Sequence, residues 1–136
     1  MTPDETKNTN KPILCLDFDG VIHRYDSGWQ GATNINDRVT DGFFEWLDQA
    51  TQHFQIVIYS SRSKEPGAID AMRSWLKVEW YRHWAPDDPP ELPEISYATE
   101  KPPAMVTIDD RAVTFTGSWG DFDPEKLLSF KPWNKM

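Results

Sequence analysis

The sequence is poor in cysteine, in long apolar runs and in net positive charge. Cys15 is the only cysteine in 136 residues, which excludes an internal disulfide framework and a cysteine-rich zinc site. Its 14 Lys and Arg against 22 Asp and Glu give a net charge of −8, which disfavours binding to nucleic acid through bulk charge alone. No apolar run approaches the ~18 residues of a membrane span, and the polar N-terminus has no signal-peptide core. We therefore expect a cytoplasmic protein with no membrane partner.

Length and composition predict one globular domain. Apolar residues make up 38% and charged residues 26% of the chain, proportions typical of a folded protein rather than a disordered or fibrous one. Residues 1–10 have no hydrophobic periodicity, so we expect a disordered N-terminal tail followed by a folded domain at 11–136.

Short apolar runs alternate with amphipathic segments along this domain. One helix is predicted to begin at Val39 with Asp37 as its N-cap, and another at Ser63 with Pro66 in its first turn. Buried strands are predicted at 12–17, 54–59 and 104–108. This alternation predicts an α/β fold with a parallel sheet.

The remaining segments carry weaker patterns. Residues 78–84 contain the cluster WYRHW, interpreted as an edge strand or as a stacking surface for nucleic acid. Six prolines in 85–103 exclude a regular helix or a central strand there. Residues 20–37 are expected to form a loop, and 124–130 a short terminal helix.

Unusual polar residues follow each predicted strand. Asp17 and Asp19 come after the first strand, Ser60 to Arg62 after the second, and Asp109 and Asp110 after the last. The carboxyl ends of parallel strands meet at one edge of the sheet, so these side chains should converge. Four carboxylates without His or Cys favour Mg²⁺ over zinc or copper.

A magnesium site of this kind also favours phosphate as a ligand. Ser60, Lys101 and Arg62 are available to bind a phosphoryl group, and Gly20 allows backbone N–H groups to approach it. The expected reaction class is phosphoryl transfer. Strand register favours Ser60 over Ser61 for this contact, and Arg62 is equally consistent with a substrate contact or a structural ion pair.

Four segments in this order resemble the motifs of the haloacid-dehalogenase-like (HAD) superfamily. They are LDFDGVIH at 16–23, IYSSR at 58–62, Lys101 and VTIDDR at 106–111. The resemblance covers about residues 11–120 and implies a three-layer α/β/α, Rossmann-like core with a mostly parallel sheet. The SSR and DDR contexts are similar to those of polynucleotide 3′-phosphatases and small phage-type HAD proteins.

The resemblance implies roles for the acidic residues. Asp17 matches the nucleophile that forms an aspartyl-phosphate, and Asp19 matches the general acid/base of a phosphatase. Asp109 and Asp110 match the acids that hold Mg²⁺ together with Asp17 and the main-chain carbonyl of Asp19. Which of Asp109 and Asp110 contacts the metal directly is left open. The predicted activity is Mg²⁺-dependent phosphomonoester hydrolysis.

The resemblance also implies phosphate contacts. Ser60 matches the residue that hydrogen-bonds the transferring phosphoryl group, and Lys101 the one that neutralises its charge. Ser61, Arg62 and Arg111 lie beside these motifs and are expected to contribute to substrate binding.

No segment is long enough to form a folded cap domain over the site. Only residues 21–37 separate the first strand from its helix, which leaves room for a flap, and we expect Trp29 on that flap to stack on the leaving group. An open site suits a large phosphorylated substrate, such as a nucleotide or a nucleic-acid end, or closure by oligomerisation. The alternatives are a 3′-phosphatase of nucleic-acid end repair and a phosphate-binding module without turnover.

Overall fold

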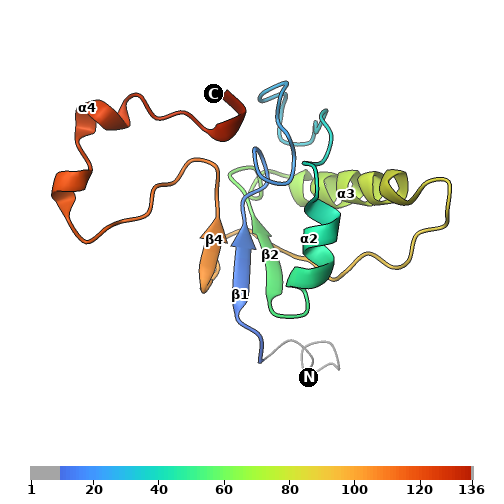
Figure 1. The fold of residues 1–136 in the computed structure, drawn as a ribbon. Helices are drawn as coiled ribbons and strands as arrows, with labels where there is room; N and C mark the ends of the chain where they lie inside the picture. The colour runs from blue at the N-terminus through green and yellow to red at the C-terminus, as the bar shows by residue number, and fades with distance from the viewer. Residues whose placement is uncertain (1–9, 136) are drawn as a thin grey trace.

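The computed structural model describes residues 10–135, so the predicted disordered tail lies outside the described residues except for Asn10. The elements up to the last strand are β1 (Ile13–Leu16), α2 (Phe43–Ala50), β2 (Gln55–Tyr59), α3 (Ala68–Trp84), β3 (Ser96–Ala98) and β4 (Val106–Ile108) (Figure 1). The chain then continues through η1 (Trp119–Asp121), α4 (Pro124–Leu127) and η2 (Trp133–Lys135). This alternation of strands and helices confirms the predicted α/β class.

The four strands form one parallel sheet in the order β3-β2-β1-β4. Leu16 of β1 lies between Ile58 of β2 and Ile108 of β4. Because all the strands run in one direction, their carboxyl ends share one edge of the sheet, as the sequence predicts.

Helices α2 and α3 cover the same face of the sheet. Side chains alternate along a strand, so Leu14 and Leu16 point to one face, and both belong to the core that contains residues of both helices. The two helices also pack on each other, with the rings of Phe44 and Trp80 5.1 Å apart. Within residues 10–135 no helix adds to a core on the opposite face, so the expected third layer is not confirmed.

Helix α2 begins four residues later than predicted. The N-cap is Gly42, with a left-handed φ of 82°, and not Asp37. The Asp37 carboxylate instead accepts hydrogen bonds from the amide and hydroxyl of Ser27, 2.8 and 2.7 Å away. The amide of Val39 donates to the buried Glu79, which keeps the chain extended before the helix.

Helix α3 differs from the prediction at both ends. It begins at Ala68 rather than Ser63, whose hydroxyl accepts a hydrogen bond from the amide of Ser60. The strand predicted at 78–84 is wrong, because the helix continues to Trp84. The buried side chains along α3 recur at the helical period: Met72, Leu76, Glu79 and Trp80. The aromatic cluster therefore belongs to the helix.

The two outer strands are short. The sequence missed β3, which lies at one edge of the sheet and so agrees with the exclusion of a central strand from 85–103. The strand predicted at 104–108 is confirmed as β4, but it spans only three residues at the other edge of the sheet. All three are exposed, so the predicted burial is wrong.

Residues 111–135, here called the C-terminal arm, extend away from β4 and return to the loop that follows β1 (Figure 1). The amide of Glu125 donates to Asp123, which caps α4, and this helix ends at Leu127, before the predicted Phe130. Near the end of the arm, the Trp133 indole donates to the Gly20 carbonyl over 2.6 Å. No helix in residues 10–135 is both long and apolar enough to cross a membrane.

Candidate functional site

Three acids meet where β1 and β4 end. One carboxylate oxygen from each of Asp17, Asp109 and Asp110 lies within 4.8 Å of the others. The pairing of Leu16 with Ile108 brings the residues after these strands together, and the Asp17 amide donates to the Ile108 carbonyl over 3.0 Å. The structure therefore places three of the four predicted acids in one cluster.

The acidic cluster shifts the protonation of its own members. Burial raises the pKa of Asp17 to about 7, and the charges of Asp109 and Asp110 act in the same direction. A hydrogen bond from the Phe18 amide opposes this shift. Burial also raises the pKa of Asp110, which shares a hydrogen bond with Asp17. Asp17 thus keeps its proton to a higher pH than an isolated carboxyl group would.

Gly20 leaves the space that the Asp110 side chain of the cluster occupies. Its φ of 82° lies in the left-handed region, and a Cβ at this position would overlap the Asp110 carboxylate. The glycine expected to let phosphate approach therefore lies against an acidic side chain in this structure.

A pocket of about 310 Å³ lies beside the cluster. Its lining includes Asp17, Asp109 and the exposed Lys101, together with Cys15, Tyr59, Thr107 and Ala112. The structure thus brings the predicted lysine to the same pocket as two of the predicted acids.

Asp19 lies outside the cluster and is held by cationic and polar partners. The Arg62 guanidinium donates to both of its carboxylate oxygens, over 3.0 Å from Nε and 2.9 Å from Nη2. Nδ1 of His23 lies 2.9 Å from Oδ1 of the same carboxylate. Its two oxygens are both engaged, and its carboxylate does not join the other three acids with which it was expected to converge.

Arg62 is fully buried and joins Asp19 to the flap. Its Nη1 donates to the carbonyl of Ala32 over 3.0 Å and, more weakly, to that of Gly31 over 3.4 Å. The Trp29 ring lies 4.8 Å from the guanidinium carbon, a cation–π distance, and Trp29 is 52% exposed. Of the two interpretations of Arg62, the structure shows the ion pair.

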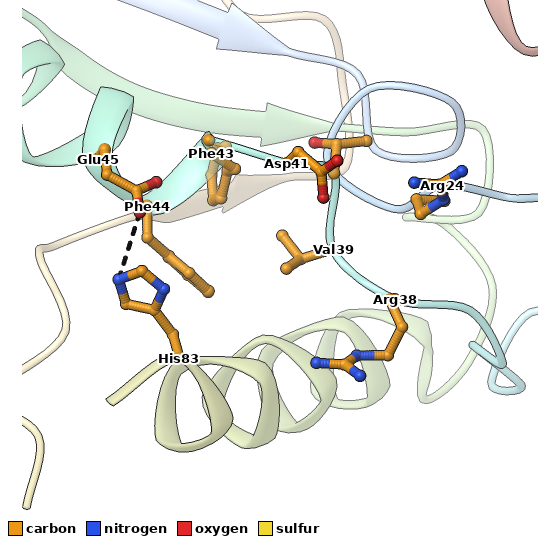
Figure 2. Close-up of a pocket in the computed structure, with 10 residues that line it drawn as sticks. Arg24, Arg38, Val39, Asp41, Phe43, Phe44, Glu45 and His83 are labelled. Atoms are coloured by element: carbon orange, nitrogen blue, oxygen red, sulfur yellow. Dashed lines mark ion pairs between the residues drawn. The ribbon is translucent and has the colours of Figure 1, made fainter. Parts of the chain in front are cut away.

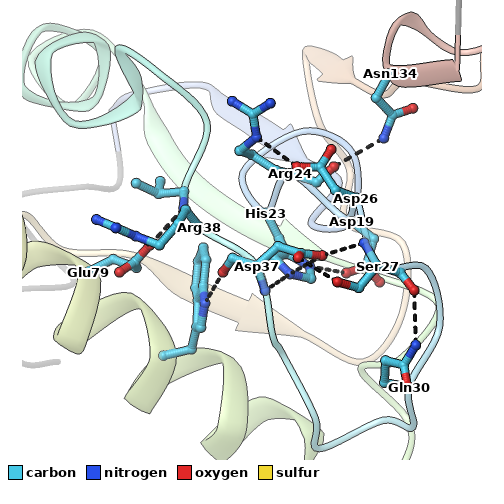
Figure 3. Close-up of polar contacts among 12 residues, drawn as sticks. Asp19, His23, Arg24, Asp26, Ser27, Gln30, Asp37, Arg38, Glu79 and Asn134 are labelled. Atoms are coloured by element: carbon cyan, nitrogen blue, oxygen red, sulfur yellow. Dashed lines mark hydrogen bonds and ion pairs between the residues drawn. The ribbon is translucent and has the colours of Figure 1, made fainter.

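His23 is a member of this network that the sequence analysis did not identify. It is buried, and its Nε2 accepts a hydrogen bond of 3.1 Å from the Asp37 amide (Figure 3). Because Nε2 is an acceptor, Nδ1 carries the proton and donates it to Asp19. The spacing of four residues between Asp19 and His23 was the available signal, since a tight glycine turn between them brings the two side chains together.

The remaining predicted phosphate ligands are less directly placed. Ser60 is buried, and its hydroxyl accepts a weak 3.3 Å hydrogen bond from the Arg62 amide rather than lining the pocket. Ser61 is exposed. The guanidinium Nε of Arg111 lies 3.9 Å from Asp110, and its amide donates to Asp109. Arg111 therefore lies beside the acidic cluster.

A second, larger pocket of about 580 Å³ lies between α2 and α3 and contains none of the predicted site residues. Most of its charged side chains have partners: Arg38 pairs with Glu79, Arg24 with Asp26, and His83 with Glu45, the pair drawn in Figure 2. The exposed Asp41 also lines this pocket. Because its lining mixes acidic and basic side chains, the pocket does not concentrate charge of one sign as the acidic cluster does.

Comparison of the chain with protein-family models, curated proteins and solved structures gave no match. The function is therefore argued from the site itself.

Proposed function

We propose that the chain is a Mg²⁺-dependent phosphomonoester hydrolase of the HAD type with Asp17 as its nucleophile. The observation that supports this most is the meeting of Asp17, Asp109 and Asp110 beside a pocket lined by Lys101. These residues match the first, third and fourth motifs of the superfamily. The proposal includes the three-layer core typical of that superfamily and a cytoplasmic location.

The donor set of the cluster fits a hard divalent cation. All three donors are carboxylate oxygens, as Mg²⁺ prefers, and no His or Cys takes part. A cation held by Asp17, Asp109 and Asp110 would relieve the repulsion that helps to raise the pKa of Asp17. When bound, it would neutralise the carboxylates and polarise a phosphoryl oxygen.

The proposed reaction has two displacements at phosphorus. A carboxylate oxygen of Asp17 attacks, the bond from phosphorus to the alcohol oxygen breaks, and Asp19, released from Arg62 and protonated from water, gives its proton to that oxygen. Water then attacks the aspartyl-phosphate, gives its proton to Asp19, and releases inorganic phosphate from Asp17. Lys101 neutralises charge on the transferring group.

Asp19 must first be released for this role. Both of its oxygens are engaged by Arg62 and His23, so the acid/base step requires the carboxylate to turn away from at least one of these partners. In the proposed resting enzyme, Asp19 is therefore bound to Arg62 and His23 beside the flap.

The same engagement of Asp19 favours a second candidate, a phosphate-binding module without turnover. A module that only binds needs the cation and Lys101 but no free acid/base group. It predicts phosphate binding by the protein and no hydrolysis of any phosphomonoester.

A Mg²⁺-dependent phosphatase screen separates the two candidates. The substrates should include an aryl phosphate, nucleotides, sugar phosphates, phosphopeptides and oligonucleotides with 3′- or 5′-phosphate ends. We expect turnover by the natural chain and by Asp48→Asn, an exposed control on α2, but none by Asp17→Asn. Acid-quenched protein should carry one phosphoryl group by intact mass, absent in Asp17→Asn. Equal turnover by Asp17→Asn would overturn the assignment, and binding without turnover would support the module.

A further inference from the structure

An apolar surface beside β4 is left uncovered. The register places Val106 beside Leu14 and Ile108 beside Leu16, on the face that carries α2 and α3. Val106 is nevertheless 46% and Ile108 41% exposed, because the helices cover the other strands. Next to them lies a hollow of about 210 Å³ with five apolar lining residues, Leu16, Val21, Phe43, Trp46 and Ile108. These five residues and Val106 are here called the β4 groove.

The C-terminal arm has a matching excess of exposed apolar side chains. Within residues 111–135 only Pro132 is buried. Leu128 is 88% and Trp119 80% exposed, the highest values among the exposed large apolar residues of the described chain. Four further large side chains of the middle of the arm are exposed: Val113, Phe115, Leu127 and Phe130. Of the aromatic side chains, Phe115, Trp119 and Phe122 lie in ring contact with one another, and clustered exposed apolar side chains are typical of an interaction surface.

The arm does not cover the groove of its own chain. It begins directly after Asp110, and its end is held by hydrogen bonds from Trp133 to the Gly20 carbonyl and from Asn134 to the Arg24 carbonyl. With both ends fixed near the acidic cluster, the middle of the arm projects away from β4 (Figure 1).

Charge also favours contact between the arm of one copy and residues 1–110 of another. From residue 111 onward the chain has four basic and three acidic side chains, a net charge of +1. Residues 1–110 have ten basic and nineteen acidic side chains, a net charge of −9. Residues 1–110 of two copies therefore repel each other. The arm carries a small charge of the opposite sign and does not add to that repulsion.

We propose that a second copy of this chain occupies the β4 groove, with the arm of each copy covering the groove of the other. Such an exchange uses the same two surfaces twice and closes on itself with two-fold symmetry. It also shields the outer edge of β4, whose unpaired backbone would otherwise invite open-ended strand addition. The proposal goes beyond the phosphatase activity and does not depend on it.

Light scattering coupled to gel filtration tests the proposal. We expect the natural chain to have twice its monomer mass of 15.8 kDa. Leu128→Glu, which changes an exposed side chain and should leave the fold intact by circular dichroism, should weaken the dimer at least about tenfold. Val78→Glu, at a half-exposed position on α3 outside both surfaces, should stay dimeric. A monomeric natural chain, or equal dissociation by both variants, would overturn the proposal.

Cross-linking identifies which arm occupies the groove. Val106→Cys and Leu128→Cys are made in separate chains, mixed, and treated with a short bifunctional maleimide. The natural Cys15 is buried and should not react. A covalent species of one Val106→Cys chain and one Leu128→Cys chain supports the exchange. Linkage within a single chain carrying both changes, or a ladder of larger species, would overturn it.

Discussion

Asp17 and Asp19 are two residues apart, yet their surroundings are opposite. Asp17 is partly buried and lies among carboxylates, with its pKa raised to about 7, whereas Asp19 lies against the Arg62 guanidinium and the His23 ring. The strand-to-loop turn after Leu16 sends the two side chains to different neighbours. The same short motif thus contributes to two different sites. Asp17 belongs to an anionic cluster that favours an added cation, whereas Asp19 belongs to an ion pair in which Arg62 is already the cation.

The largest expected effect is the loss of the Asp19 partner. Arg62→Met removes both hydrogen bonds to Asp19 and leaves that carboxylate in a mostly buried site, which should lower the free energy of unfolding by about 3–5 kcal/mol in urea titrations. Arg24→Met removes an exposed pair with Asp26 and should lower the free energy of unfolding far less than Arg62→Met does. Equal losses in the two variants would show that the Arg62 pair is no stronger than a surface pair.

Asp17→Asn should raise the free energy of unfolding, whereas Arg62→Met lowers it. In the folded chain Asp17 keeps its proton up to about pH 7, whereas its usual pKa is 3.8, so the folded state binds more protons between these values. Stability therefore falls as pH rises through that window. Asp17→Asn, which cannot ionise, should stabilise the metal-free protein by at most about 4 kcal/mol above pH 7 and by little near pH 4. Thermal unfolding against pH, with Asp48→Asn as the control, measures this difference.

Added Mg²⁺ should stabilise the folded protein by binding to the acidic cluster around Asp17. At a concentration ten times the dissociation constant, a cation that binds only the folded state adds about 1.4 kcal/mol. We expect a rise in Tm for the natural chain and for Asp48→Asn. Asp109→Asn and Asp110→Asn should show a smaller rise. The same rise in all four proteins would place the bound cation elsewhere.

The smallest expected effect concerns the flap over Arg62. Trp29→Ala removes the cation–π contact and should cost about 0.5–1 kcal/mol, because the ring is half exposed. Trp29→Phe keeps an aromatic face and should cost less. For the proposed phosphatase, we also expect Trp29→Ala to raise KM for the physiological substrate more than for an aryl phosphate. Unchanged stability in chemical unfolding of Trp29→Ala would show that the ring contributes nothing to the Asp19 network.

Local pattern predicted the strands near the site better than the helix boundaries. The strand predictions at 12–17 and 54–59 succeeded because buried parallel strands are continuous apolar runs. The start of α2 failed because Asp37, a good capping residue by type, bonds to Ser27 in the flap instead. The strand predicted at 78–84 failed because its aromatic residues repeat at helical spacing and pack on α2.

In the candidate site, too, one part could be predicted from the sequence and another could not. Sequence order was enough to expect Asp17, Asp109 and Asp110 at one edge of a parallel sheet, and the structure brings them together. It was not enough to assign the neighbours of Asp19, because Arg62 arrives from the end of a different strand, 43 residues away, and the carbonyls of Gly31 and Ala32 come from the flap.

The sequence by itself determined the two central strands and the acids that follow β1 and β4, because apolar runs and the residue types at their ends are local properties. Only the tertiary structure decided which charge each acid meets. That choice depends on how separate strands are aligned and how the flap folds back, and these are set by packing between distant segments. It left Asp17 with other carboxylates and gave Asp19 a buried arginine.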